Sequence, residues 1–200
     1  TKIYLNSEWT VNSHGEISLC SDVEIRDDLI EFLPRFGLRF HLQKTFHICE
    51  YFGMGPEDSY IDKCRSSYMG RFKRTVETMF TDYIKPQENG NRHNTKYGAV
   101  YDNKHCGLMV VSREGMDFSA LPYSHEELEA AAHNYELPEP SHTVVTADYK
   151  QSGVGSGACG PALAEQYRLS EKKFTFRIKI RPVTENSGSV LTTALTEYTP

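Results

Sequence analysis

Apolar and polar residues alternate along most of this 200-residue chain. A period of two predicts β-strands with one buried face and one exposed face. The pattern is clearest in residues 173–180, which read KFTFRIKI. It also predicts strands in six other segments, namely residues 3–5, 17–25, 37–42, 46–51, 107–111 and 142–147. The chain is therefore predicted to be all-β.

One segment interrupts the alternation. Ser124 is followed three residues later by Glu127, which is the signature of a capping box, and residues 128–132 (LEAAA) favour a helix. Pro138 stops any continuation. A weaker helical pattern covers residues 62–69, where an irregular loop fits equally well. We therefore expect one short helix, beginning near Ser124.

The strands are short and long loops separate them. This favours antiparallel strands in two large sheets packed face to face over an up-and-down barrel. The length allows one domain, which we assign to residues 1–183. The remainder, 184–200, is rich in Thr, Ser and Glu, and we expect it to be a ragged or disordered tail.

Charge and cysteine content narrow the classes of function. The net charge is −5 and the basic residues are scattered, so we predict no nucleic-acid partner. No apolar run reaches the roughly 18 to 20 residues of a membrane span, and the first residues lack the apolar core of a signal peptide. The odd number of cysteines, five at irregular spacing, favours reduced thiols and a cytoplasmic location. A start at Thr1 suggests a segment of a longer protein.

No catalytic pair is evident among the acidic residues. A retaining glycosidase needs two carboxyl groups about 5 to 5.5 Å apart. The candidates Glu126 and Glu127 fall in the first turn of the expected helix, where acids are favoured by the helix dipole. Glu57 and Asp58 follow Pro56 in a loop, where they suit backbone hydrogen bonds, and Glu88 is a fifth candidate. None of these specifies an acid/base pair.

Metal and nucleophile signatures are also missing from the sequence. The closest histidines, His41 and His47, do not have a typical metal-ligand spacing. No nucleophile elbow of the form Gly-x-Ser-x-Gly is present, and the glycine-rich residues 153–157 lack the lysine and helix of a phosphate-binding loop.

Two loops suit contact with a ligand. The glycines of residues 153–160 let the backbone approach another surface closely and present Cys159 between small residues. Residues 89–94 read as a polar turn in which Asn89 and Arg92 could bind sugar hydroxyls, although surface turns commonly look like this.

Four motifs, in this order, resemble the C-terminal domain of family 2 β-galactosidases. They are GMGPEDSY, YIKPQENGNR, YSHEEL and GVGSGACGP, at residues 53–60, 83–92, 123–128 and 153–161. The resemblance covers roughly residues 15–182. It implies an antiparallel supersandwich similar to galactose mutarotase, here without its first strands. It also implies part of a retaining enzyme that hydrolyses terminal β-D-galactosides such as lactose.

In that family the catalytic glutamates and the magnesium and sodium ligands lie upstream of this domain. The resemblance therefore implies no catalytic carboxylate and no cofactor in this chain, which should be inactive by itself. The expected partners are the remaining domains or a large subunit, in an oligomer, and the galactoside substrate.

The same resemblance implies a substrate-binding role for one loop. The family's C-terminal domain reaches over the barrel and places a tryptophan against the sugar. The matching position here is Cys159, in a loop one residue shorter, so Gly157, Ala158 and Cys159 are the predicted substrate-binding residues, with Asn89 and Arg92 as weaker candidates.

Two other functions stay open at this point. One is a freestanding sugar-binding or mutarotase-like module, which would need an acid and a base on its concave face. The other is a purely structural interface domain.

Overall fold

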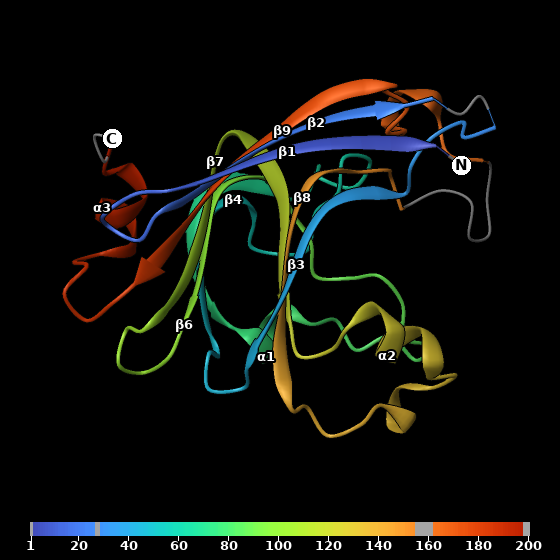
Figure 1. The fold of residues 1–200 in the computed structure, drawn as a ribbon. Helices are drawn as coiled ribbons and strands as arrows, with labels where there is room; N and C mark the ends of the chain where they lie inside the picture. The colour runs from blue at the N-terminus through green and yellow to red at the C-terminus, as the bar shows by residue number, and fades with distance from the viewer. Residues whose placement is uncertain (1, 27–28, 155–161, 198–200) are drawn as a thin grey trace.

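The computed structural model describes residues 2–26, 29–154 and 162–197, and antiparallel strands form most of its regular structure (Figure 1). Within these residues one sheet contains nine strands, which are β1 (Ile3–Val11), β2 (Ile17–Ile25), β3 (Arg35–Gln43), β4 (Ile48–Gly55), β5 (Tyr68–Thr75), β6 (Arg92–Tyr101), β7 (Gly107–Leu121), β8 (His142–Gln151) and β9 (Lys173–Val183).

Strand β7 is the branch point of the sheet. The main path runs β1-β2-β9-β7-β6-β4-β5, and β8 joins β7 to β3. Residues 107–111 of β7 pair with β9, whereas residues 117–121 pair with β8, and β6 pairs with both halves. Gly115 lies between the two halves with a φ of 99°, a conformation that side chains disfavour. The sheet therefore divides into two arms.

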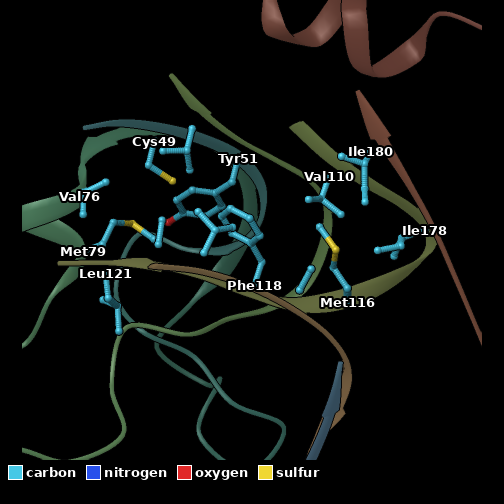
Figure 2. Packing of buried hydrophobic residues seen from close by; sticks show 14 of the residues in the cluster. Cys49, Tyr51, Val76, Met79, Val110, Met116, Phe118, Leu121, Ile178 and Ile180 are labelled. Atoms are coloured by element: carbon cyan, nitrogen blue, oxygen red, sulfur yellow. The ribbon is translucent and has the colours of Figure 1, made fainter. Parts of the chain in front are cut away.

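The main hydrophobic core lies between these arms. Phe36 of β3 packs edge-on against Phe174 and Phe176 of β9, with ring centroids 5.1 and 6.4 Å apart. The largest buried cluster also takes residues from β2, β4, β7, β8 and α1, the helix Val76–Met79. Figure 2 shows part of it, including Tyr51, Phe118 and Ile178. The expected all-β sandwich is confirmed, although hydrogen bonds connect the two arms through β7.

All seven segments predicted as strands lie in or overlap strands of the structure. Strands β5 and β6 were not predicted. Residues 89–94, interpreted as a polar turn, need correction because β6 begins at Arg92. Several polar residues of β6 are buried, which hides the alternation of a half-buried strand.

The expected count of one helix is too low. Helix α2 (His125–Ala130) begins where predicted: the Ser124 hydroxyl accepts a hydrogen bond from the Glu127 amide at 3.2 Å, and the Glu127 carboxylate accepts one from the Ser124 amide at 2.7 Å. The described part of the chain contains two other short helices, α1 and α3 (Val190–Leu195), together with the 3-10 turns η1 (Asn134–Glu136) and η2 (Glu165–Tyr167). Tertiary packing stabilises such short helices, which local pattern predicts poorly.

Helix α3 lies in the segment expected to be disordered. Its side chains Val190 and Ala194 are buried against a second hydrophobic cluster that includes Val183. The buried Arg181 of β9 donates hydrogen bonds to the carbonyls of Thr193 and Ala194 at the end of the helix. Through Glu197 the tail is therefore attached to the sheet.

Candidate functional site

Three charged or titratable side chains meet around Arg35, the first residue of β3. The guanidinium donates to Asp148 of β8 through Nε, at 3.1 Å, and through Nη2. Its Nη1 donates to Glu88 at 3.0 Å and contacts Nε2 of His125, the first residue of α2. We call Arg35, Glu88, His125 and Asp148 the Arg35 cluster. It connects β3, β8, α2 and the loop before β6.

The two carboxyl groups of the Arg35 cluster have opposite pKa shifts. Burial favours the neutral form of each. For Glu88, the hydrogen bond from His125 (2.9 Å) and the charge of Arg35 outweigh burial, so its pKa lies below the ordinary value. For Asp148, burial outweighs Arg35 and the pKa is raised. The cluster therefore combines one readily ionised acid with one that holds its proton more firmly.

Tyr60 extends the Arg35 cluster into the protein interior. Its buried hydroxyl donates to the second oxygen of Glu88, Oε1, at 3.3 Å. Burial and the nearby charge of Glu88 raise the pKa of this phenol, so it stays a donor. Glu88 thus receives contacts from three different side chains of this chain.

A second polar group surrounds Asp117 of β7. Its Oδ1 accepts from the Asn91 amide group and lies against His93 Nδ1, both at 2.9 Å, and its Oδ2 accepts from the backbone amide of Gln151 at 3.0 Å. The Gln151 side chain donates to Asp148 at 3.0 Å, which joins this group to the Arg35 cluster. The end of β8 is therefore fixed by buried polar contacts.

The residues on both sides of the glycine-rich loop are also held in place. The backbone amide of Val154 donates to Asp62 at 3.1 Å. Gly153 lies so close to Asp62 that a Cβ there would be 2.5 Å from its carboxylate. On the far side, Arg168 donates to the carbonyl of Leu163 at 2.9 Å. Residues 155–161, with the predicted site residues Gly157, Ala158 and Cys159, lie outside the described residues.

The two weaker candidates are buried and bonded within the chain. The Asn89 side chain accepts from the Thr81 amide at 3.0 Å and donates to the Gln87 carbonyl at 2.9 Å. Arg92 donates to the Tyr51 hydroxyl at 2.9 Å and to the Asn91 carbonyl at 3.0 Å. In this structure both side chains organise the chain itself, and a contact with sugar stays a prediction.

The other candidate carboxylates have local roles. Glu126 pairs with Arg39 at 2.6 and 2.8 Å, and Glu127 completes the cap of α2. Asp58 pairs with Lys63 at 3.0 Å. Of the acidic candidates, only Glu88 belongs to the Arg35 cluster. Sequence reasoning missed the rest of this cluster because strand pairing brings together residues more than 100 positions apart, such as Arg35 and Asp148.

A separate open cavity lies against α3. Its volume is about 950 Å³, and its lining combines apolar side chains, such as Ile178 of β9 and Leu195 of α3, with charged ones, such as Glu8 of β1 and Arg177 of β9. It shares no residue with the Arg35 cluster. Among the described residues no group of three or more His, Cys, Asp or Glu side chains is arranged to hold a metal ion. No helix in the described part of the chain has the length and apolar character needed to cross a membrane.

Comparison with known proteins places the chain in a family. The family described as "Beta galactosidase small chain" matches residues 1–180. The β-galactosidase of Actinobacillus pleuropneumoniae is 41% identical over 176 residues, which cover 88% of this chain and 17% of that protein. The Staphylococcus xylosus enzyme is 36% identical over 174 residues, which cover 86% of this chain and 17% of that protein. The Streptococcus thermophilus enzyme is 35% identical over 164 residues, which cover 81% of this chain and 16% of that protein. The chain spans about a sixth of the length of these relatives. It belongs to the β-galactosidase small-chain family.

Proposed function

We propose that this chain is the small-chain domain of a retaining β-galactosidase that hydrolyses terminal β-D-galactosides such as lactose. The observation that carries the proposal is the family match over residues 1–180. Relatives named β-galactosidase, in which the matching region makes up 17% of the length, support it. Retention proceeds through a galactosyl-enzyme intermediate and uses two carboxyl groups, which we assign to the rest of the enzyme.

The hydrogen bonds and ion pairs of this chain's own acidic residues support placing the catalytic carboxyl groups elsewhere in the enzyme. Glu88 and Asp148 share Arg35, and Glu126 and Glu127 serve an ion pair and a helix cap. A glycosidic acid or nucleophile must instead reach an incoming sugar. The isolated chain is accordingly proposed to be inactive.

We assign the loop of residues 155–161 to the rim of the active site. The flanking residues support this role, because Val154 is bonded to Asp62 and Leu163 to Arg168, which fixes where the chain leaves and rejoins the described structure. The residues proposed to contact the sugar are Gly157, Ala158 and Cys159. Cys159 then contacts the acceptor side of the sugar site without taking part in bond cleavage.

The remaining partners follow from the same proposal. They are the other domains or the large subunit, within an oligomer, and no nucleic acid or membrane. Magnesium and sodium would be held by those other domains. The four cysteines whose placement is described, Cys20, Cys49, Cys64 and Cys106, are free thiols, which supports a cytoplasmic location.

Substitution of Cys159 tests the rim role. In the assembled enzyme, Cys159→Trp should change the binding of glucose as an acceptor by about 1 kcal/mol, because an indole ring can stack on a sugar face. Formation of the galactosyl-enzyme should change little. Inhibition constants for glucose and the melting temperature should be measured together, with Cys159→Ser as the control. Unchanged glucose binding with a lowered melting temperature would reject the rim role.

The Arg35 cluster favours a second candidate function, that of a sugar-binding or mutarotase-like module. Its ionised acid, Glu88, lies 2.9 Å from His125, and these two partly exposed side chains are of the kind that proton transfer needs. Polarimetry of freshly dissolved α-D-galactose tests this. A mutarotation rate that does not differ between the chain and its Glu88→Gln variant would exclude it.

A further inference from the structure

Four separate segments of the chain hold the residues at the end of β8. The backbone amides of residues 151–154 all donate hydrogen bonds. Their acceptors, in order, are the Asp117 carboxylate, the Pro34 carbonyl, the Tyr167 carbonyl and the Asp62 carboxylate, at 3.0, 2.9, 3.0 and 3.1 Å. We call residues 151–154 the stem, because residues 155–161, the loop assigned to the active-site rim, follow them directly. The position of the stem therefore decides where that loop begins.

A β-bulge in β8 connects the stem to Arg35. Strands β3 and β8 lie side by side, with Arg35 and Gly37 of β3 opposite Gln151 and Asp148 of β8 (Figure 1). Strand β8 thus has one extra residue here. Residues three apart in a regular strand point to opposite faces, but the bulge lets the Gln151 side chain donate to Asp148 at 3.0 Å. A Cβ on Gly37 would lie 2.2 Å from the Asp148 carboxylate, so glycine leaves the room in which this carboxylate meets Arg35.

Arg35 also reaches the segment that holds the other end of the stem. Its Nη1 donates to Oε2 of Glu88 at 3.0 Å, and Oε1 of Glu88 accepts from the Tyr60 hydroxyl at 3.3 Å. Two residues after Tyr60 comes Asp62, the acceptor for the amide of Val154. Through its two carboxylate partners, Arg35 is therefore connected to both ends of the stem.

The charge of Arg35 balances two carboxylates that are shielded from water. The side chain of Asp148 is 4% exposed and that of Glu88 is 26% exposed. Removing one member of such a buried ion pair leaves a charge without compensation, which is costly. Arg39, four residues along the same strand, pairs instead with Glu126, which is 67% exposed. Loss of an exposed ion pair has little effect on stability. The two arginines of β3 therefore form a matched pair for experiments.

We propose that Arg35 is a positioning residue for acceptor binding: through Asp148 and Glu88 it holds the stem and thereby sets the affinity for the sugar that accepts the galactosyl group. This rests on the proposed function. In the second step of a retaining reaction, an oxygen of water or of the acceptor bonds to the anomeric carbon as the bond to the catalytic carboxylate breaks, and its proton passes to the general base. Arg35 acts on the choice between water and acceptor, and the bond changes belong to the rest of the enzyme.

The partition of the galactosyl-enzyme between glucose and water tests the proposal in the complete β-galactosidase. At a fixed glucose concentration, Arg35→Gln should lower the ratio of transfer to hydrolysis at least about threefold, because a displaced stem misplaces the contact with the acceptor. Loss of folded enzyme lowers both products equally and leaves this ratio unchanged. Arg39→Gln is the matched control and should keep the ratio of the unsubstituted enzyme. The same ratio in Arg35→Gln would overturn the proposal.

Hydrogen exchange of the stem gives a measurement that does not depend on activity. In the complete enzyme, the amides of Gln151 and Val154 should exchange about tenfold faster in Arg35→Gln than in Arg39→Gln. Arg35→Lys keeps the charge but cannot bond Asp148 through two nitrogens, so it should change the exchange and the product ratio in the same direction by a smaller amount. If Arg35→Gln does not fold, an unchanged ratio and unchanged exchange in Arg35→Lys would reject the positioning role.

The outcomes separate this proposal from the proposed function. A complete enzyme that does not cleave a chromogenic galactoside would reject both. An enzyme that cleaves it, but has the same product ratio and the same exchange in Arg35→Gln and Arg39→Gln, would retain the function and reject the positioning role. Faster exchange of the stem with an unchanged product ratio would show that Arg35 only supports the fold, and the proposal would be wrong.

Discussion

Strands β1 and β2 are neighbours with the same pattern and different surroundings. Both alternate apolar residues over nine positions, and both direct that set to the same face of the sheet. Every residue of β1 is exposed, whereas Leu19, Val23 and Ile25 of β2 are buried. The difference arises because the other arm, through Phe36 and Tyr149, packs over the end of β2 that holds Val23. Alternation thus specifies a strand and its apolar face, but not what covers that face.

The Arg35 cluster differs from β1, because its polar groups find their partners within the chain. Arg35, Glu88 and Asp148 all have partners within the chain, and Gln151 extends the network toward Asp117. The charged groups of the Arg35 cluster therefore have partners within the chain, while the apolar side chains of β1 do not. The predictions below test this division.

The largest expected difference in the free energy of unfolding is between two leucine-to-alanine variants, one on β2 and one on β1. Leu19→Ala should lower the free energy of unfolding by about 3 kcal/mol, because it leaves a cavity in the core. Leu5→Ala should change it by less than about 0.5 kcal/mol in this chain, because Leu5 is already exposed to water. Urea unfolding of both variants measures the difference. Equal losses would show that β1 is covered within the chain, contrary to the comparison.

A smaller effect is expected from the pH dependence of the Arg35 cluster. The pKa of Glu88 is lowered in the folded state, so its stabilisation is present above the unfolded pKa and is lost as the pH falls through the folded one. The pKa of Asp148 is raised, so its contribution has the opposite sign: it is present at low pH and is lost as the pH rises through the folded pKa.

Two isosteric variants separate these contributions. Between about pH 6 and about pH 3, the loss of unfolding free energy should be smaller in Glu88→Gln and larger in Asp148→Asn than in the unsubstituted chain, each by less than about 1 kcal/mol. Chemical denaturation at several pH values provides the measurement. If the unfolding free energy changed with pH in the same way in all three proteins, neither carboxyl group would have a shifted pKa.

The sequence predicts the local features of the fold better than its site. Alternation locates β2 and β9, and the cap at Ser124 locates α2. Strand β6 was missed because buried polar residues such as Thr95 interrupt its apolar pattern. The Arg35 cluster was missed except for Glu88, because its members meet only through the pairing of β3 with β8 and the docking of α2. No local sequence pattern indicates which strand β3 pairs with or where α2 docks.

A galactosidase assay of the separated parts tests the central claim most directly. It compares the complete β-galactosidase, this chain alone, and the remaining polypeptide alone, each with a chromogenic galactoside. We predict turnover by the complete enzyme, none by this chain, and recovery when the two parts are combined. Turnover by the purified chain that disappears in its Glu88→Gln variant would contradict the account, because the catalytic acids would then lie in this domain.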